Sequence, residues 1–202
     1  MIRAEATKDD LPEIVDLYAT TFAADPSVGW VVRRAKNPRA LLAKVFTILL
    51  TEHYLPRGVI DTVRDDKGRL LGAASWEPPK VHVSASVNAR LLAVLPSAGL
   101  AAADMLAYEY HLSKVKLPFP CWYLFTLAVS PEARGQGVGS MLLEHGIDRC
   151  GGDAIMLEAS STRSARLYRD KGFFALGASP SPGPHSEIVM WRPAADLPGA
   201  AQ

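Results

Sequence analysis

The chain has 202 residues, of which 49% are hydrophobic and 21% charged, a composition typical of a folded globular protein. A formal net charge of +1, with scattered basic residues, argues against a surface dedicated to nucleic acid or to acidic membranes. The two cysteines, Cys121 and Cys150, supply no disulfide framework, so we expect a reduced, cytoplasmic protein. We expect no signal sequence and no membrane span, because no window approaches the ~20 apolar residues that a span needs.

The first half of the sequence predicts strands and two amphipathic helices. A capping pattern at Thr7–Asp10 precedes an apolar stripe with helical spacing. Two later apolar segments flank an Asp- and Gly-containing separator that is typical of a hairpin turn. The elements expected here are strands at 2–4, 59–63 and 70–76, and helices at 14–22 and 38–54.

The second half adds a pair of helices within 86–114, broken at Pro96. The continuous apolar run 121–129 is typical of a buried strand. The remaining expected elements are a helix ending at Cys150, strands at 154–158, 173–176 and 187–191, and a helix at 163–171. We find no internal repeat. The sequence therefore predicts one α/β domain over residues 1–202, a mixed sheet with helices on its faces.

Three glycines fall within five residues in the segment Ser130–Ser140, between the apolar run and the next helix. A strand, a glycine turn and a helix start form an anion site, because unpaired amides and the helix dipole point the same way. A P-loop is excluded since the segment has no lysine. A dinucleotide fingerprint has Gly135, Gly137 and the acid Glu158, but only 44 residues follow that acid and the second half of such a fold is missing. A simple tight turn stays open.

Two motifs together resemble a known family. Arg134–Gly139 has the pattern Arg-x-x-Gly-x-Gly, and residues 164–173 contain Leu-Tyr-x-x-x-Gly-Phe. They resemble the coenzyme A pyrophosphate loop and a later helix of the GNAT superfamily of N-acetyltransferases, best over about 121–176. The sequence from Ser160 to Phe173, with the late Met-Trp-Arg-Pro, resembles the branch that contains puromycin N-acetyltransferase. The resemblance implies a GNAT (acyl-CoA N-acyltransferase) fold with a splayed central strand pair.

The resemblance further implies acetyl-CoA as co-substrate, bound without a metal. The glycine segment would hold the diphosphate through its amides, and the exposed backbone of the central strand would pair with the pantetheine arm. Ser164 stands where relatives often have asparagine, and it reaches less far. The predicted coenzyme-binding residues are Leu127, Ala128, Val129, Arg134, Gly135, Gln136, Gly137, Val138, Gly139, Ser140, Ser164 and Tyr168.

The chemistry of thioester aminolysis assigns four candidate catalytic groups. Tyr168 matches the general-acid position of the family: with a pKa near 10 it is protonated at neutral pH and can give a proton to the leaving thiolate. The Val129 amide is a candidate for stabilising the tetrahedral oxyanion. Glu158 and Glu77 are candidate bases for the acceptor ammonium, although a strand-end glutamate is often merely solvated and a water chain is an alternative.

The acceptor side is predicted from the family arrangement, in which the first helices and the last strands form the wall. Aromatic walls suit an apolar or planar amine, and a carboxylate would orient its ammonium. An equally open interpretation is that these side chains close the core. Phe173 and Phe174 are interpreted as core, and the five histidines as structural or surface residues. The candidates for the acceptor wall are Phe22, Asp25, Trp30, Trp76 and Tyr108.

The sequence thus predicts an acetyl-CoA-dependent N-acetyltransferase of a small-molecule primary amine, a monomer or homodimer without nucleic-acid, membrane or metal partners. Two alternatives stay open. One is an acetyltransferase of protein lysines or N-termini, and the other is a non-catalytic acyl-CoA-binding sensor.

Overall fold

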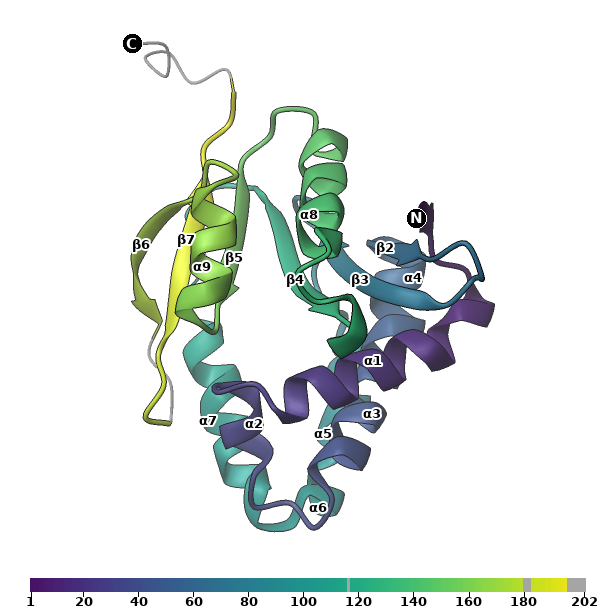
Figure 1. The fold of residues 1–202 in the computed structure, drawn as a ribbon. Coiled ribbons are helices and arrows are strands. Elements are labelled where there is room, and N and C mark those ends of the chain that lie inside the picture. Colours follow the sequence, from purple (N-terminus) through teal and green to yellow (C-terminus); the bar gives the residue numbers. More distant parts are fainter. Residues whose placement is uncertain (116, 180–182, 196–202) are drawn as a thin grey trace.

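A seven-stranded sheet forms the centre of the molecule in the computed structural model, which describes residues 1–115, 117–179 and 183–195 (Figure 1). The strand order is β1-β2-β3-β4-β5-β7-β6, and all neighbouring pairs are antiparallel except β4 and β5. The predicted mixed sheet flanked by helices is confirmed. The strands are β1 (Ile2–Glu5), β2 (Val59–Arg64), β3 (Leu70–Glu77), β4 (Trp122–Val129), β5 (Ile155–Ala159), β6 (Phe174–Ser179) and β7 (Glu187–Arg192).

The helices pack in two groups that bury two apolar clusters. The first cluster, which includes Ile14, Tyr18 and Phe46, joins α1 to α3 and the later helices. The second cluster, which includes Trp76 and Leu142, joins the sheet to α8 and α9. The helices are α1 (Leu11–Ala23), α2 (Val28–Val32), α3 (Pro38–Leu49), α4 (Leu55–Arg57), α5 (Ala85–Leu92), α6 (Leu95–Ala98), α7 (Ala102–Leu112), α8 (Val138–Arg149) and α9 (Thr162–Arg169).

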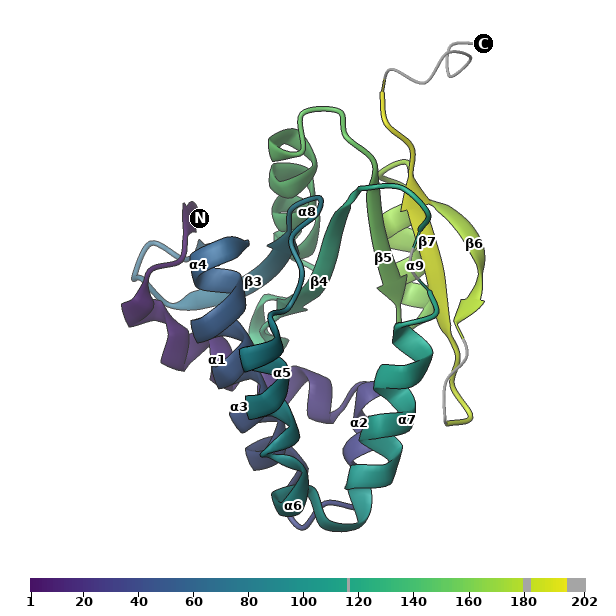
Figure 2. The same cartoon turned by 180° about the vertical axis from the view of Figure 1, so that it is seen from behind.

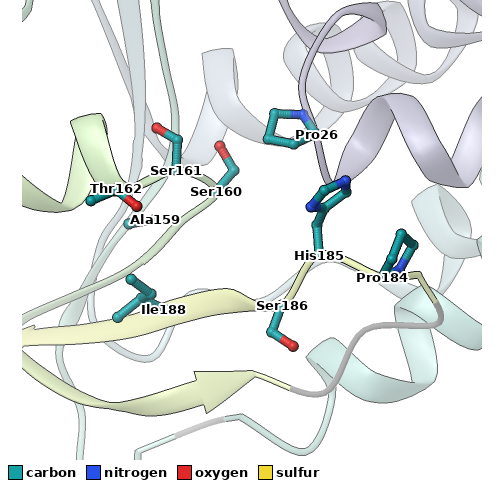
Figure 3. A pocket seen from close by; sticks show the side chains of 9 residues that line it. All are labelled: Pro26, Ala159, Ser160, Ser161, Thr162, Pro184, His185, Ser186 and Ile188. Atoms are coloured by element: carbon teal, nitrogen blue, oxygen red, sulfur yellow. The ribbon is translucent and has the colours of Figure 1, made fainter.

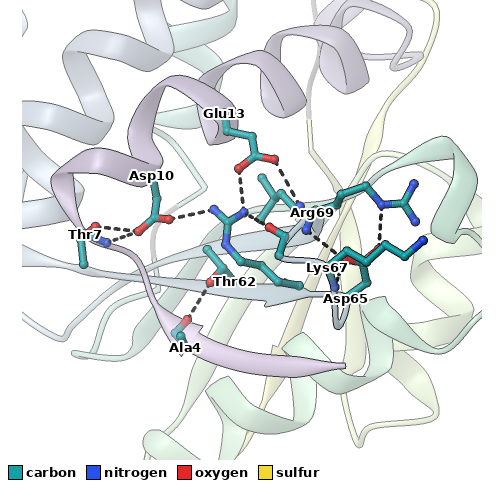
Figure 4. A network of polar contacts seen from close by, with 11 residues as sticks. Ala4, Thr7, Asp10, Glu13, Thr62, Asp65, Lys67 and Arg69 are labelled. Atoms are coloured by element: carbon teal, nitrogen blue, oxygen red, sulfur yellow. Dashed lines mark hydrogen bonds and ion pairs between the residues drawn. The ribbon is translucent and has the colours of Figure 1, made fainter.

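Polar contacts fix the start of α1 against the β2–β3 hairpin (Figure 4). The amide and hydroxyl of Thr7 both donate to Asp10 at 2.7 Å, which confirms the predicted cap. Arg64 donates to Asp10 at 2.8 Å and to Glu13 at 2.7 Å. Asp65 accepts two backbone amides of the hairpin turn. The first helix is therefore anchored to the sheet edge by charged groups as well as by its apolar stripe.

Several predicted boundaries are corrected. The second helix does not end at Tyr54, because a π-helical turn at Leu50–Tyr54 leads directly into α4. The strand β6 runs on to Ser179, and the predicted turn after it lies partly outside the described residues. Phe173 is buried as expected, whereas Phe174 is 60% exposed. Phe174 begins an edge strand, so its side chain points to solvent.

β4 is kinked by a bulge and then leaves β5. Trp76 of β3 pairs with Leu124 and Ser75 pairs with Thr126, so the intervening Phe125 has no β3 partner. An unpaired extra residue bends a strand and increases its twist. β4 and β5 accordingly pair over only three register positions, the last being Leu124 with Leu157. The two strands then diverge (Figure 1), as the predicted splayed pair requires.

Within the described residues, a single segment, Ala85–Leu112, is long and apolar enough to span a membrane by length and composition. Its mean hydropathy is 1.6 over a window that is 17% buried, so the expectation that no such window exists is wrong. In the folded chain this segment is not one straight helix. It bends at Gly99, where φ is +56°, and Figure 2 shows α5 and α7 as two arms joined through α6.

Gly146 of α8 lies directly against the indole of Trp76. A Cβ at Gly146 would sit 1.9 Å from Cζ2 of that ring, and the ring is fully buried, so it has no room to move. We expect Gly146→Ala to lower the free energy of unfolding by about 1–3 kcal/mol, despite the better helix propensity of alanine. Urea denaturation checks this. Gly139→Ala in the same helix is the matched control, because its nearest contact would be an ordinary 3.6 Å.

Candidate active site

The glycine segment forms an exposed turn that ends at the first residue of α8. Gly135 and Gly137 both have φ of +81°, and a Cβ at either would meet nothing within 4 Å. The glycines are therefore required by backbone conformation rather than by crowding. The first amides of α8 have no intrahelical partner and point out of the helix start with its dipole. This backbone geometry fits a diphosphate group.

The side chains around this turn differ in what they can contribute. Arg134 is exposed, next to the turn, and free to approach an anion. Gln136 is exposed, and its Nε2 donates to the carbonyl of Glu132. Val138 is 1% exposed and belongs to the second cluster, so only its amide is available. Gly139 and Ser140 complete the first turn of the helix.

The diverging end of β4 carries the three residues predicted to face the pantetheine arm. Ala128 packs into the first cluster, whereas Leu127 and Val129 pack toward α8. Past Leu124 the strand has no register partner on β5. Its backbone edge on that side is therefore available to a ligand that adds as a strand would.

Tyr168 lies on α9 and packs in the second cluster. It is 7% exposed, and its ring packs on Phe173 at 5.9 Å. Its hydroxyl makes no hydrogen bond to another described residue. Burial, with a smaller contribution from the charge of Asp25, raises the pKa of Tyr168. The hydroxyl is thus protonated at neutral pH and free to donate.

The start of α9 is closed by its own side chains. Ser161 accepts the Ser164 amide at 3.1 Å, and Ser164 in return accepts the Ser161 amide at 3.2 Å. The Ser164 hydroxyl also donates to the Ser161 carbonyl at 2.9 Å. A hydroxyl with these partners has little capacity left. The Ser164 hydroxyl therefore caps the helix, and its contact with the coenzyme stays a prediction.

Three carboxylates gather near the residues predicted for the acceptor wall, and we call Asp25, Glu158 and Glu187 the acidic cluster. Glu158 accepts from the hydroxyl of Tyr123 at 2.8 Å, and Glu187 accepts from the hydroxyl of Tyr108 at 2.8 Å. Asp25 accepts the Ser27 and Val28 amides, and its other oxygen accepts the Ser160 hydroxyl at 2.5 Å.

The acidic cluster has no compensating positive charge among the described residues. Burial raises the pKa of Glu158 to about 7, and the charge of Glu187 adds to this rise while the Tyr123 hydrogen bond opposes it. Burial likewise raises the pKa of Glu187, which is 5% exposed. Among the described residues, no Lys, Arg or His forms an ion pair with any member of the cluster. Carboxylates withdrawn from water without a cation are costly, and a bound ammonium would relieve that cost.

Strand alternation places Glu158 and Glu187 on one face of the sheet. Leu157 and Ile188 pack in the second cluster, under α8 and α9. Their neighbours Glu158 and Glu187 must point to the opposite face, because successive side chains on a strand alternate. The glycine turn before α8 and these two carboxylates therefore lie on opposite faces of the sheet.

A cavity of about 350 Å³ opens where β5 ends and β7 begins, and no member of the acidic cluster is part of its lining (Figure 3). Ser160, the hydrogen-bond partner of Asp25, is part of its wall, and Pro26 and His185 lie close together on the side opposite Ala159 and Thr162. It is large enough for a small organic molecule. The lining residues are Pro26, Ala159, Ser160, Ser161, Thr162, Pro184, His185, Ser186 and Ile188.

The other predicted wall residues are only partly brought together. Phe22 packs against Tyr18 and Phe46 in the first cluster. Trp30 is partly buried, with the Arg33 guanidinium stacked 3.4 Å from its ring centroid. Trp76 is fully buried in the second cluster, on the α8 face, so its prediction as an acceptor-wall residue is wrong.

Sequence reasoning missed four residues on the acceptor side. Tyr123 donates a hydrogen bond to Glu158 of the acidic cluster, and Glu187 is itself a member of that cluster. Tyr54 stacks on Phe125 with ring centroids 4.8 Å apart. His53, interpreted as structural or surface, is 0% exposed and hydrogen-bonds the candidate base Glu77 at 2.6 Å. For Glu187, its position at the start of the last strand is the sequence signal that could have indicated a place in the site.

No group of three or more His, Cys, Asp or Glu side chains within the described ranges is arranged to hold a metal ion.

The model of the acetyltransferase (GNAT) family matches residues 63–173, more than half of the chain. The protein therefore belongs to the GNAT family of acetyltransferases, whose members use acetyl-CoA as co-substrate.

Two solved structures illustrate the likeness. One, described as a histone acetyltransferase HPA2 and related acetyltransferase from Corynebacterium glutamicum, is 38% identical, with 98% of this chain and 97% of that chain covered and a TM-score of 0.77. The other is a phosphinothricin acetyltransferase from Sinorhizobium meliloti in complex with acetyl-CoA. It is 18% identical, with 96% of this chain and 88% of that chain covered and a TM-score of 0.56, and it shows the fold alone.

A curated relative, N-alpha-acetyltransferase 40 of Saccharomyces cerevisiae, is 33% identical over 75 residues. The match covers 31% of this chain and 26% of the yeast protein. The chain thus spans about a quarter of that relative, so the relative's own activity is not transferred by the match. Relatives named for protein substrates and relatives named for small molecules both occur.

Proposed function

We propose that this protein transfers the acetyl group of acetyl-CoA to a primary amine of a small molecule. The observation that carries the proposal is the acidic cluster, in which Glu158 and Glu187 each accept from a tyrosine hydroxyl and no member pairs with a cation among the described residues. An ammonium group supplies the missing charge. The cavity of about 350 Å³, whose lining residue Ser160 bonds Asp25, suits a molecule of limited size.

The reaction assigns a role to each candidate group. The acceptor ammonium loses a proton to the Glu158 carboxylate, and the neutral nitrogen attacks the thioester carbonyl carbon. The Val129 amide donates to the oxyanion that forms. A C–N bond forms as the C–S bond breaks, and the nitrogen releases its second proton to solvent. The thiolate takes its proton from Tyr168, which is resupplied from solvent. The products are the N-acetyl amine, coenzyme A and one proton.

The coenzyme roles follow from the same geometry. We assign the diphosphate to the amides of Gly135, Gly137 and the first turn of α8, with Arg134 beside them. The pantetheine arm runs along the free edge of β4 at Leu127–Val129. Neither assignment uses a metal ion. The same proposal places the protein in the cytoplasm, where acetyl-CoA is available.

Release of coenzyme A from acetyl-CoA, followed with a thiol reagent, tests the proposal over a panel of small amines and a panel of lysine-containing and free N-terminal peptides. We expect saturable turnover with at least one small amine and none with peptides. Turnover confined to peptides would assign the protein to the protein-acetylating class. Tight acetyl-CoA binding with no turnover in either panel would identify a sensor.

A further inference from the structure

The helix that begins at Pro38 changes its winding at Leu50–Tyr54, where one π-helical turn joins α3 to α4. A turn of this kind inserts an extra residue, is rare, and occurs often at functional sites. Here it carries two consecutive interior side chains, His53 at 0% and Tyr54 at 2% exposed. Both belong to the face of the sheet that carries the acidic cluster.

One ring nitrogen of His53 makes a hydrogen bond, and the other has no partner among the described residues. Its Nε2 lies 2.6 Å from Oε2 of Glu77, and its buried Nδ1 has no partner among the described residues. A proton on Nδ1 would leave a buried N–H unpaired, which is costly away from water. We therefore place the proton on Nε2, which donates to the Glu77 carboxylate.

Glu77 is the last residue of β3, and its neighbour Trp76 points toward α8. Alternation turns Glu77 to the opposite face, where it is the register partner of Tyr123, whose hydroxyl bonds Glu158. The Glu77 side chain is 16% exposed, and its Oε1 has no hydrogen bond to a described residue. One oxygen of Glu77 is thus held by His53 while the other stays available on the face of the sheet that carries Glu158.

Tyr54 completes the link between the two carboxylates. Its ring packs edge-on to His53 at 4.8 Å and flat on Phe125, the bulged residue of β4, at 4.8 Å. The charges of both Glu77 and Glu158 act on Tyr54. The π-helical turn therefore fixes His53 and Tyr54 in one rigid unit against the kinked strand, between the two acids.

We propose that His53 is a positioning residue for acetyl transfer: it holds Glu77 so that the free Oε1 accepts a hydrogen bond from the acceptor amine. The proposal rests on the proposed function and deepens it, because it adds a second anchoring carboxylate to the Glu158 base. His53 itself does not touch the acceptor.

A kinetic test uses His53→Leu, His53→Gln and Glu77→Gln. Losing a hydrogen bond to a charged group costs about tenfold or more in binding. We therefore expect His53→Leu and Glu77→Gln each to raise the KM of the amine about tenfold, with the KM of acetyl-CoA unchanged. His53→Gln keeps an N–H donor and should restore most of the loss. The double variant should be no worse than Glu77→Gln alone, since both changes break one interaction.

Leu49→Ala, one residue before the π-helical turn and 8% exposed, is the matched control for loss of packing. It should lower stability and leave the KM of the amine unchanged. The proposal is overturned if His53→Leu behaves like Leu49→Ala in the KM of the amine, or if His53→Gln is as impaired as His53→Leu.

Imidazole nitrogen NMR tests the arrangement without any turnover, so it separates this proposal from the proposed function. The wild type should show His53 as a neutral ring protonated at Nε2, and Glu77→Gln should shift the Nε2 signal. A proton on Nδ1, or an imidazolium at neutral pH, would overturn the positioning role even if an amine substrate is found.

Discussion

Replacing Tyr168 with phenylalanine should lower kcat by about 10²–10⁴-fold, the usual contribution of a positioned acid, with little change in the KM of acetyl-CoA. The ring would still pack on Phe173, so α9 should keep its place. What is lost is the only hydroxyl donor that we assign to the leaving sulfur. Because burial raises the pKa of Tyr168, the hydroxyl stays protonated, and its removal should matter equally throughout the neutral range.

Steady-state kinetics at several acetyl-CoA concentrations check this result. Tyr110→Phe is the matched control, because Tyr110 is 61% exposed on α7 and has no assigned role. A Tyr168→Phe enzyme with nearly full kcat would remove Tyr168 from the mechanism and leave proton delivery to water.

Replacing Glu158 with glutamine should have the second large effect, a loss of kcat/KM for the amine of about 10²-fold or more. The wild-type profile should rise with pH and level off above about 7, because burial raises the pKa of Glu158 to about 7 and only the ionised carboxylate accepts a proton. Glu158→Gln should abolish that rise.

Tyr123→Phe provides a directional control for the same profile. The Tyr123 hydroxyl donates to the Glu158 carboxylate and so lowers its pKa against the effect of burial. Without it, the midpoint of the rise should move to higher pH. A midpoint that stays fixed, or moves down, would show that the rise belongs to another group.

The free energy of unfolding should also depend on the ionisation of Glu158, and it should fall, not rise, as this carboxyl loses its proton. A carboxyl whose folded pKa lies above its ordinary 4.5 favours the folded state when protonated. This contribution is complete below about pH 4.5 and is lost as the pH rises through about 7. The wild type should therefore lose stability relative to Glu158→Gln between these values, as measured by urea denaturation.

The coenzyme side was predictable because its signals are local. The glycines at 135 and 137 need positive φ, and the helix after them follows within one residue. Spacing in the sequence is enough to specify such a turn, and the Leu-Tyr motif of α9 then fixes the order of elements. The strand divergence itself depends on the bulge at Phe125, which no residue type in the apolar run indicates.

The acceptor side was predicted less well because its contacts join distant segments. Asp25 meets Ser160 across 135 positions, and Tyr108 meets Glu187 across 79. Trp76 and Glu77 were both expected near the acceptor, although consecutive strand residues face opposite sides, and only Glu77 lies on that face. The π-helical turn that buries His53 has no signature that periodicity alone could reveal.

The central claim is that acetyl-CoA binds at the turn before α8 without a metal, and calorimetric titration tests it most directly. Wild-type protein in the presence of a chelator should bind acetyl-CoA in the micromolar range and not bind NAD. Gly137→Ile should lose this binding, because a branched residue is strained at φ of +81°, while keeping the cooperative unfolding of the wild type. Failure of the wild type to bind acetyl-CoA, or unchanged binding by Gly137→Ile, would contradict the assignment of the glycine turn.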